Sequence, residues 1–184
     1  MGARYEARLS GSGGQGMILA GVILAEAAGI FDGKFVTQTQ SYGPEARGGA
    51  SRSDVIISDE EIDYPKAEEL DLLLTLTQQA YDSYYKLLKP GKILIYDCDY
   101  VSPTKKDADY EVAGYPITAV AREYVGKEIV ANIVALGIIA EKTKIVTRGA
   151  IENAVLQRVP KGTEALNRRA LEVGYELAQG KELL

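Results

Sequence analysis

The sequence predicts an α/β fold: a single Rossmann-like domain whose mostly parallel open sheet carries helices on both faces. Strand and helix patterns alternate along the first two thirds of the chain, and the last third is helical in pattern. A glycine-rich loop joins the first strand to an apolar helix. The run Leu72–Leu76 is apolar without alternation, as in a parallel strand covered on both faces. The 184 residues suit one domain spanning residues 1–184.

The first elements follow from hydrophobic patterning. Tyr5–Leu9 alternates weakly, as a strand does, and is expected to end at the glycine loop Ser10–Gly16. Met17–Ala28 is apolar almost all round, which predicts a buried helix. Phe35–Thr39 is expected to be the second strand and Ser51–Ile57 the third, with a second glycine-rich loop between them.

The later elements continue this alternation until the helical C-terminal third. Lys89-Pro90-Gly91 is expected to stop a helix, and Thr147 is expected to cap one. In chain order, we expect a helix over Gln78–Leu88, a strand over Lys92–Tyr96, a short strand over Tyr110–Ala113, a turn at Gly114-Tyr115-Pro116, a short helix up to Tyr124, a helix over Asn132–Lys142, a helix from Thr147 to Arg158, and a final helix with a stripe of Leu166, Ala170, Val173 and Leu177.

The composition excludes several classes of function. The net charge of -5 provides no electrostatic attraction for nucleic acid. The chain has no histidine, so it cannot form a catalytic triad of the Ser/His/Asp or Cys/His type. Cys98 is the single cysteine, and an iron-sulfur cluster or a zinc ribbon needs several thiolates. We therefore expect no catalytic residue and no metal site in this chain.

The sequence also predicts a cytoplasmic protein with no membrane partner. Its most hydrophobic stretch, Met17–Phe31, contains Glu26 and is shorter than the roughly 20 apolar residues that span a bilayer. The first residues lack the apolar run and small-residue cleavage site of a signal peptide, so we expect no export. A single cysteine fits a reducing compartment.

The first glycine loop has the spacing of an anion-binding turn. Gly11, Gly13 and Gly16 match G-x-G-x-x-G after a strand and before a helix, with Gly14 and Gln15 inside the loop. Glycines allow a ligand to come close to the backbone, and the N–H groups at a helix N-terminus favour phosphate or carboxylate. The loop can therefore bind an anion or meet the backbone of another chain.

Two other interpretations of the loop stay open. A dinucleotide site needs an acidic residue at the end of the second strand, where this chain has Gln38, Thr39 and Gln40. A Walker phosphate loop needs a closing Gly-Lys-Ser/Thr, which this segment lacks. The glycines can also serve only tight packing of the strand against the helix.

The second glycine loop is expected beside the first, because open α/β sheets carry their crevices at the carboxyl ends of the strands. Glu45 and Arg47 can bind substrate, meet the charges of a partner, or stay solvated. The segment consists of Tyr42, Gly43, Pro44, Glu45, Ala46, Arg47, Gly48 and Gly49.

Three segments together resemble the gamma subunit of 2-oxoacid:ferredoxin oxidoreductases. They are Gly11–Gly16 (G-S-G-G-Q-G), Ser41–Gly49 (S-Y-G-P-E-A-R-G-G) and Asn132–Gly137. The second segment resembles the 2-oxoglutarate branch, whereas the pyruvate branch more often has F-G-P-E-R-R-G. Ser58–Pro65 also resembles the 2-oxoglutarate branch. The resemblance covers most of the chain and implies that residues 1–184 form one gamma-type domain.

The resemblance implies an enzyme complex that decarboxylates a 2-oxoacid on thiamine diphosphate with Mg²⁺. It passes electrons through a [4Fe-4S] cluster to ferredoxin and delivers the acyl group to coenzyme A. Alpha, beta and ferredoxin-like delta subunits would hold these cofactors, and this chain would be inactive alone. Both glycine loops would then face the alpha and beta chains and help to receive coenzyme A. The alternatives are a free-standing Rossmann-type nucleotide-binding protein or oxidoreductase, and a structural scaffold subunit.

Overall fold

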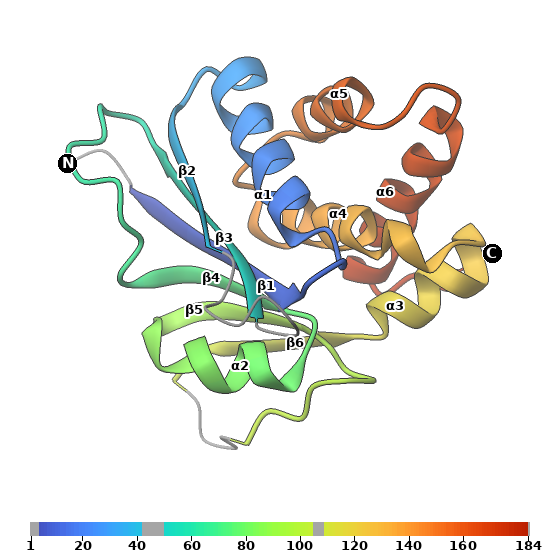
Figure 1. The fold of residues 1–184 in the computed structure, drawn as a ribbon, viewed down its shortest axis with the longest axis horizontal. Helices are drawn as coiled ribbons and strands as arrows, with labels where there is room; N and C mark the ends of the chain where they lie inside the picture. The colour runs from blue at the N-terminus through green and yellow to red at the C-terminus, as the bar shows by residue number, and fades with distance from the viewer. Residues whose placement is uncertain (1–3, 42–49, 105–108, 184) are drawn as a thin grey trace.

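The computed structural model describes residues 4–41, 50–104 and 109–183. One sheet forms the centre of the domain, with helices on either side (Figure 1). Its elements are β1 (Tyr5–Ser12), α1 (Met17–Glu26) continued by a π-helical turn (Ala27–Phe31), β2 (Phe35–Ser41), β3 (Ala50–Ser58), β4 (Leu70–Thr75), α2 (Gln78–Tyr84) with a 3₁₀ turn (Tyr85–Leu87), β5 (Leu88–Asp97), β6 (Glu111–Tyr115), α3 (Ile117–Val120) continued by a π-helical turn (Ala121–Val125), a 3₁₀ turn (Glu128–Val130), α4 (Ala131–Thr143), α5 (Arg148–Arg158) and α6 (Glu164–Ala178).

The six strands are ordered β2-β3-β1-β4-β5-β6. β1, β4, β5 and β6 pair in parallel, whereas β3 pairs antiparallel with both β1 and β2. β2 therefore points the same way as β1, and β3 alone is reversed. This arrangement confirms the predicted mostly parallel sheet, with a β2-β3 hairpin added at one edge.

Helices cover both faces of the sheet, as predicted, but unequally. The larger core cluster joins β1, β3 and β4 to α1, α4, α5 and α6, and the smaller one lies under α2. All six residues of β4 are buried. The unbroken apolar run thus marks the central strand, as the sequence predicted.

Several expected boundaries differ from the observed ones, and three of the differences have a clear cause. β1 continues to Ser12, because its last residues pair with the start of β3. The helix after β4 ends at Tyr84 and β5 already begins at Leu88, which pairs with Leu70 ahead of a register shift. The expected turn at Gly114-Tyr115-Pro116 begins too early, because Gly114 and Tyr115 belong to β6. Each error concerns residues whose state depends on a strand distant in the sequence.

The predicted cap at Thr147 is confirmed, since its hydroxyl oxygen accepts a hydrogen bond from the Ala150 N–H at 3.2 Å. The Thr147 hydroxyl also donates to Asp32 Oδ1 at 2.7 Å. This bond ties the start of α5 to the end of the α1 segment.

α4 is the central helix of the larger layer. Ten successive residues, from Ala131 to Ala140, are buried. α6 crosses α4 so closely that a Cβ on Gly137 would lie 3.1 Å from the Cα of Gly174 and would collide with the carbonyl oxygen of Leu171. A Cβ on Gly174 would in turn lie 2.9 Å from the Cα of Gly137. The two backbones are therefore in direct contact, and only glycine fits at the crossing.

Gly137→Ala is expected to lower the free energy of unfolding by about 1–3 kcal/mol, because the added methyl group forces the helices apart. Gly149→Ala is the matched control, because a Cβ at Gly149 in α5 meets no atom within 4 Å. That change should be neutral or stabilise the protein by up to about 1 kcal/mol. Urea unfolding followed by circular dichroism measures both variants. Equal stability of Gly137→Ala and the original protein would contradict the backbone contact.

Candidate functional site

The first glycine loop lies at the switch point of the sheet. The chain leaves β1 toward β2 on one side, and leaves β4 toward β5 on the other. In open α/β sheets, a crevice forms outside the carboxyl ends of the two strands at such a point. The Leu76 N–H donates to the carbonyl oxygen of Ser10 at 3.0 Å, which fixes the ends of the two strands together.

The Gln15 side chain holds the conformation of the glycine loop by a hydrogen bond inside it. Its Oε1 accepts a hydrogen bond from the Ser12 N–H at 2.7 Å, so the side chain folds back over the end of β1. A Cβ on Gly11 would collide with this Oε1 and lie 3.3 Å from Met17 Cγ. A side chain at Gly11 would therefore displace Gln15 from this hydrogen bond, and we assign Gly11 a structural role.

Gly16 connects the loop to α4. Its φ of 73° lies in the left-handed region, which disfavours any residue with a Cβ. Its carbonyl oxygen accepts from the Ala20 N–H at 2.9 Å and from Asn132 Nδ2 at 3.3 Å. A Cβ on Gly16 would lie 2.5 Å from Asn132 Nδ2. Gly16 thus sets the start of α1 against the start of α4.

Asn132 was not predicted as a site residue. It is buried at the start of α4, and its amide is the link to Gly16. The only signal for it in the sequence was its place in the segment Asn132–Gly137 that resembles the family.

Gly13 and Gly14 differ from the other loop glycines, because both are exposed and a Cβ on either meets no atom within 4 Å of the described chain. Gly14 has a φ of 91°, whereas Gly13 is not in the left-handed region. Gly13 is therefore a position where a side chain can be added without strain. It is therefore the loop glycine at which an added side chain tests contact with a ligand or another chain.

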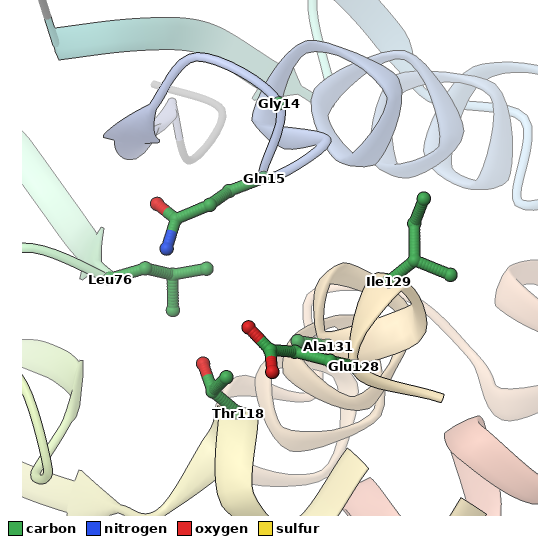
Figure 2. A pocket seen from close by; sticks show the side chains of 7 residues that line it. All are labelled: Gly14, Gln15, Leu76, Thr118, Glu128, Ile129 and Ala131. Atoms are coloured by element: carbon green, nitrogen blue, oxygen red, sulfur yellow. The ribbon is translucent and has the colours of Figure 1, made fainter. Parts of the chain in front are cut away.

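A crevice of about 230 Å³ opens beside the loop. Figure 2 shows the amide of Gln15 and the carboxylate of Glu128 pointing into it from opposite sides, with Ile129 at its edge. Because Gln15 Oε1 is already engaged, Nε2 is the amide group available to a ligand. The remaining lining residues are Gly14, Leu76, Thr118 and Ala131.

Thr118 contributes an unpaired polar group to this crevice. Its N–H donates to Asp97 Oδ2 at 2.8 Å, which fixes the start of α3 against the end of β5. Its hydroxyl is buried and has no hydrogen-bond partner among the described residues. A buried hydroxyl without a partner costs free energy, so a ligand that bonded to it would be favoured. The crevice can thus donate hydrogen bonds from Gln15 and Thr118 and accept one at Glu128.

A second, mostly apolar groove of about 350 Å³ adjoins the crevice, sharing Gly14 and Ile129 with it. Ile129 is 76% exposed and Leu19 is 39% exposed. Large apolar side chains that gather at one exposed place mark a contact surface. The groove is also lined by Ile133, Val159, Pro160 and Leu166.

The sheet order argues against a dinucleotide site. In a dinucleotide fold, the acidic residue that holds the ribose follows a strand parallel to the first and next to it. Here the neighbour of β1 on that side is the antiparallel β3, and β2 is one strand further away. Gln38, in β2, donates through Nε2 to Ser53 Oγ at 2.8 Å instead.

The second glycine loop, Tyr42 to Gly49, lies outside the described residues. The described residues on either side of it are part of the sheet: Ser41 pairs with Arg52, and Ala50 pairs with Ser12. The segment thus connects two strand ends that lie close to the first loop. The roles predicted for Tyr42, Gly43, Pro44, Glu45, Arg47, Gly48 and Gly49 stay predictions.

Cys98 is exposed, and partial burial together with the carboxylates of Asp99 and Asp97 raises the pKa of its thiol above the usual value. A raised pKa lowers the fraction of reactive thiolate at neutral pH, which argues against a reactive thiol at this position. Among the residues that the structure describes, no three His, Cys, Asp or Glu side chains form a group able to hold a metal. None of the described helices is long and apolar enough to span a bilayer.

Comparison with known proteins gives a consistent set of relatives. The family described as "Pyruvate ferredoxin/flavodoxin oxidoreductase" matches residues 6–177. The 2-oxoglutarate synthase subunit KorC of Methanocaldococcus jannaschii is 52% identical over 96% of this chain and 95% of its own length. The KorC subunit of Methanothermobacter marburgensis is 47% identical over 95% of this chain and 96% of its own.

A solved structure agrees with these sequence matches. The gamma subunit of keto/oxoacid ferredoxin oxidoreductase from Geobacter sulfurreducens is 50% identical and superposes with a TM-score of 0.89. The match covers 97% of this chain and 98% of that one. The likeness therefore extends over the whole described domain.

Gly16→Ala is expected to lower the free energy of unfolding by about 1–3 kcal/mol, because the methyl group meets Asn132 and φ becomes strained. Gly13→Ala is the matched control within the same loop and should change stability by less than about 0.5 kcal/mol. Thermal unfolding of both variants checks this difference. If the two changes were equally costly, the separation of the loop into structural and open glycines would be wrong.

Proposed function

Because the chain belongs to the pyruvate ferredoxin/flavodoxin oxidoreductase family, we propose that it is the gamma subunit of a 2-oxoglutarate:ferredoxin oxidoreductase. The complex oxidatively decarboxylates 2-oxoglutarate to succinyl-CoA and passes the electrons to ferredoxin. The observation that carries this proposal is the near full-length identity to 2-oxoglutarate synthase subunits from two organisms. The loop order S-Y-G-P-E-A-R-G-G at Ser41–Gly49 supports the same branch.

The composition supports the proposal that other subunits bind the cofactors. A [4Fe-4S] cluster needs four protein thiolates and this chain has one cysteine, so other chains hold the cluster. We assign thiamine diphosphate and Mg²⁺ to the alpha and beta chains as well. A ferredoxin-like delta chain then carries electrons to ferredoxin. We also propose that the complex lies in the cytoplasm and that this chain has no turnover by itself.

We assign the glycine loop to contact with the alpha and beta chains. Gly13 and Gly14 are exposed, and the neighbouring groove presents Leu19 and Ile129 to solvent. An exposed apolar surface next to an open backbone favours association with another protein. The second loop, Tyr42–Gly49, is proposed to belong to the same contact, since Ala50 pairs with Ser12 beside the first loop.

The polar groups that line the crevice support a role in receiving part of coenzyme A. The pantetheine arm of coenzyme A carries amide groups, which accept and donate hydrogen bonds. The unpaired Thr118 hydroxyl and Gln15 Nε2 can donate to such groups, and the Glu128 carboxylate can accept from them. Glu128 Oε2 is paired with Arg122 Nε at 3.3 Å, yet the carboxylate that faces the crevice still suits an amide N–H better than a phosphate. We therefore propose that the crevice holds the amide arm while the phosphates lie elsewhere.

The substrate assignment is tested on the assembled complex purified from its native host. Turnover with 2-oxoglutarate should exceed that with pyruvate by at least about a hundredfold in kcat/KM, because pyruvate lacks the second carboxylate. Ferredoxin reduction in the presence of coenzyme A measures both rates. Preference for pyruvate, or recovery of this chain as a lone monomer, would overturn the assignment.

The role of the loop is tested by Gly13→Val, which adds a side chain where the described chain leaves space. The isolated variant should melt within a degree or two of the original protein, because no described atom is displaced. In the complex, the side chain should keep the partner surface apart and lower the rate or the yield of assembly about tenfold or more. Gly13→Ala, which adds less volume, is the matched control. Full activity of Gly13→Val would remove the loop from the contact.

A further inference from the structure

A separate polar groove lies on the opposite, α2 side of the sheet. The strand register places Thr39, Asp54 and Arg8 in one row across β2, β3 and β1, with Arg52 two residues before Asp54 on the same face. α2 packs on β1 and β4, and its last residue, Tyr84, lies over Arg8 and Arg52 of this part of the sheet. The resulting groove has a volume of about 600 Å³.

The floor of the groove is a buried ion pair. Arg8 Nε donates to Asp54 Oδ1 at 2.6 Å and Arg8 Nη2 donates to Asp54 Oδ2 at 2.8 Å. Their side chains are 3% and 8% exposed. Arg8 Nη2 also donates to the carbonyl oxygen of Ala67 at 3.3 Å. This bidentate pair engages both carboxylate oxygens of Asp54, while Arg8 Nη1 has no acceptor among the described residues.

The ring of Tyr84 holds two guanidinium groups at the groove. The Cζ atom of Arg8 lies 4.7 Å from the ring centroid, and that of Arg52 lies 5.6 Å from it. Such cation–π contacts orient an arginine without using its N–H donors. Arg52 is 35% exposed, and its contact with Asp54 is long, at 3.9 Å. Its donors are therefore largely available to a ligand.

The charged side chains of the groove offer more hydrogen-bond donors than its own carboxylates accept. Lys66 lines the groove, is exposed, and has no ion pair within the described part of the chain. Glu68 is the other acid of the groove, and its Oε1 accepts from the Tyr64 hydroxyl at 3.0 Å. Three cations thus face two carboxylates, one of which is fully engaged by Arg8.

We propose that Arg8, Arg52 and Lys66 form a binding site for an oxyanion, either a carboxylate or a phosphate group, separate from the glycine-loop crevice. Arg52 and Arg8 Nη1 provide planar donors matched to two oxygens of the anion, and Lys66 adds a mobile charge. The buried Arg8–Asp54 pair fixes the position of the site, since neither side chain can move without leaving a charge unpaired.

The first test titrates the isolated full chain with inorganic phosphate at constant ionic strength and follows the arginine Nε–Hε resonances by NMR. Phosphate should shift the Arg52 and Arg8 signals saturably, and Arg52→Gln should weaken its binding by about tenfold. Arg52→Lys should give an intermediate affinity, because it keeps the charge and loses the planar donors. Lys66→Gln should weaken binding less.

Arg168→Gln is the matched control, because Arg168 is an exposed arginine on α6 with its own partner, Glu152. Thermal melting shows whether each variant is folded, and Arg52→Gln leaves the Arg8–Asp54 pair in place. Absence of a saturable shift overturns the proposal. Equal weakening by Arg52→Gln and Arg168→Gln means an adventitious ion only, and also overturns it.

The second test identifies where the anion comes from. The assembled complex is titrated with phosphate, and recovery of the complex is compared for the original chain and Arg52→Gln. Retained phosphate binding in the complex with unchanged recovery supports a small ligand. Blocked binding together with reduced recovery of Arg52→Gln supports an acidic side chain from a partner subunit. Neither titration depends on catalysis, so failure of the oxidoreductase assignment leaves the result interpretable.

Discussion

The backbones of α4 and α6 touch at Gly137 and Gly174, and the position of the glycine loop follows from that contact. With α6 held this close, α4 lies in the same core cluster as Leu72 and Leu74 of the central strand. The start of α4 then places Asn132 against the carbonyl oxygen of Gly16. A packing constraint in the C-terminal third therefore fixes a loop at the beginning of the chain.

The contact between α4 and α6 also positions residues of the crevice. The helical third therefore does more than bury one face of the sheet. The 3₁₀ turn before α4 supplies Glu128 and Ile129 to the crevice, opposite Gln15. One wall of the crevice is thus positioned by the pair α4 and α6. The opposite wall is positioned by the turn between β1 and α1. Close-packed protein interiors transmit small displacements. A change at the crossing of α4 and α6 therefore shifts the residues that line the crevice.

Much of the fold was predictable because its signals are local. The apolar run of β4, the Thr147 cap and the glycine turn before α1 each depend on residues close together in the sequence. The reversed β3 and the early start of β5 at Leu88 depend instead on partner strands far along the chain. The same holds for the candidate site: the loop glycines were proposed from their local spacing, whereas Asn132 and Thr118 reach the site through long-range packing.

The β2-β3 hairpin has a consequence for how such a subunit diversifies. Ser41 and Ala50 mark the two ends of its connection, and each is held in register by a neighbouring strand. A connection between fixed strand ends can change in sequence and length at little thermodynamic cost. The parallel strands and the helical layer would keep their packing if this segment were changed. The hairpin is therefore an exchangeable part, through which evolution or an engineer can adapt a common scaffold to a different complex.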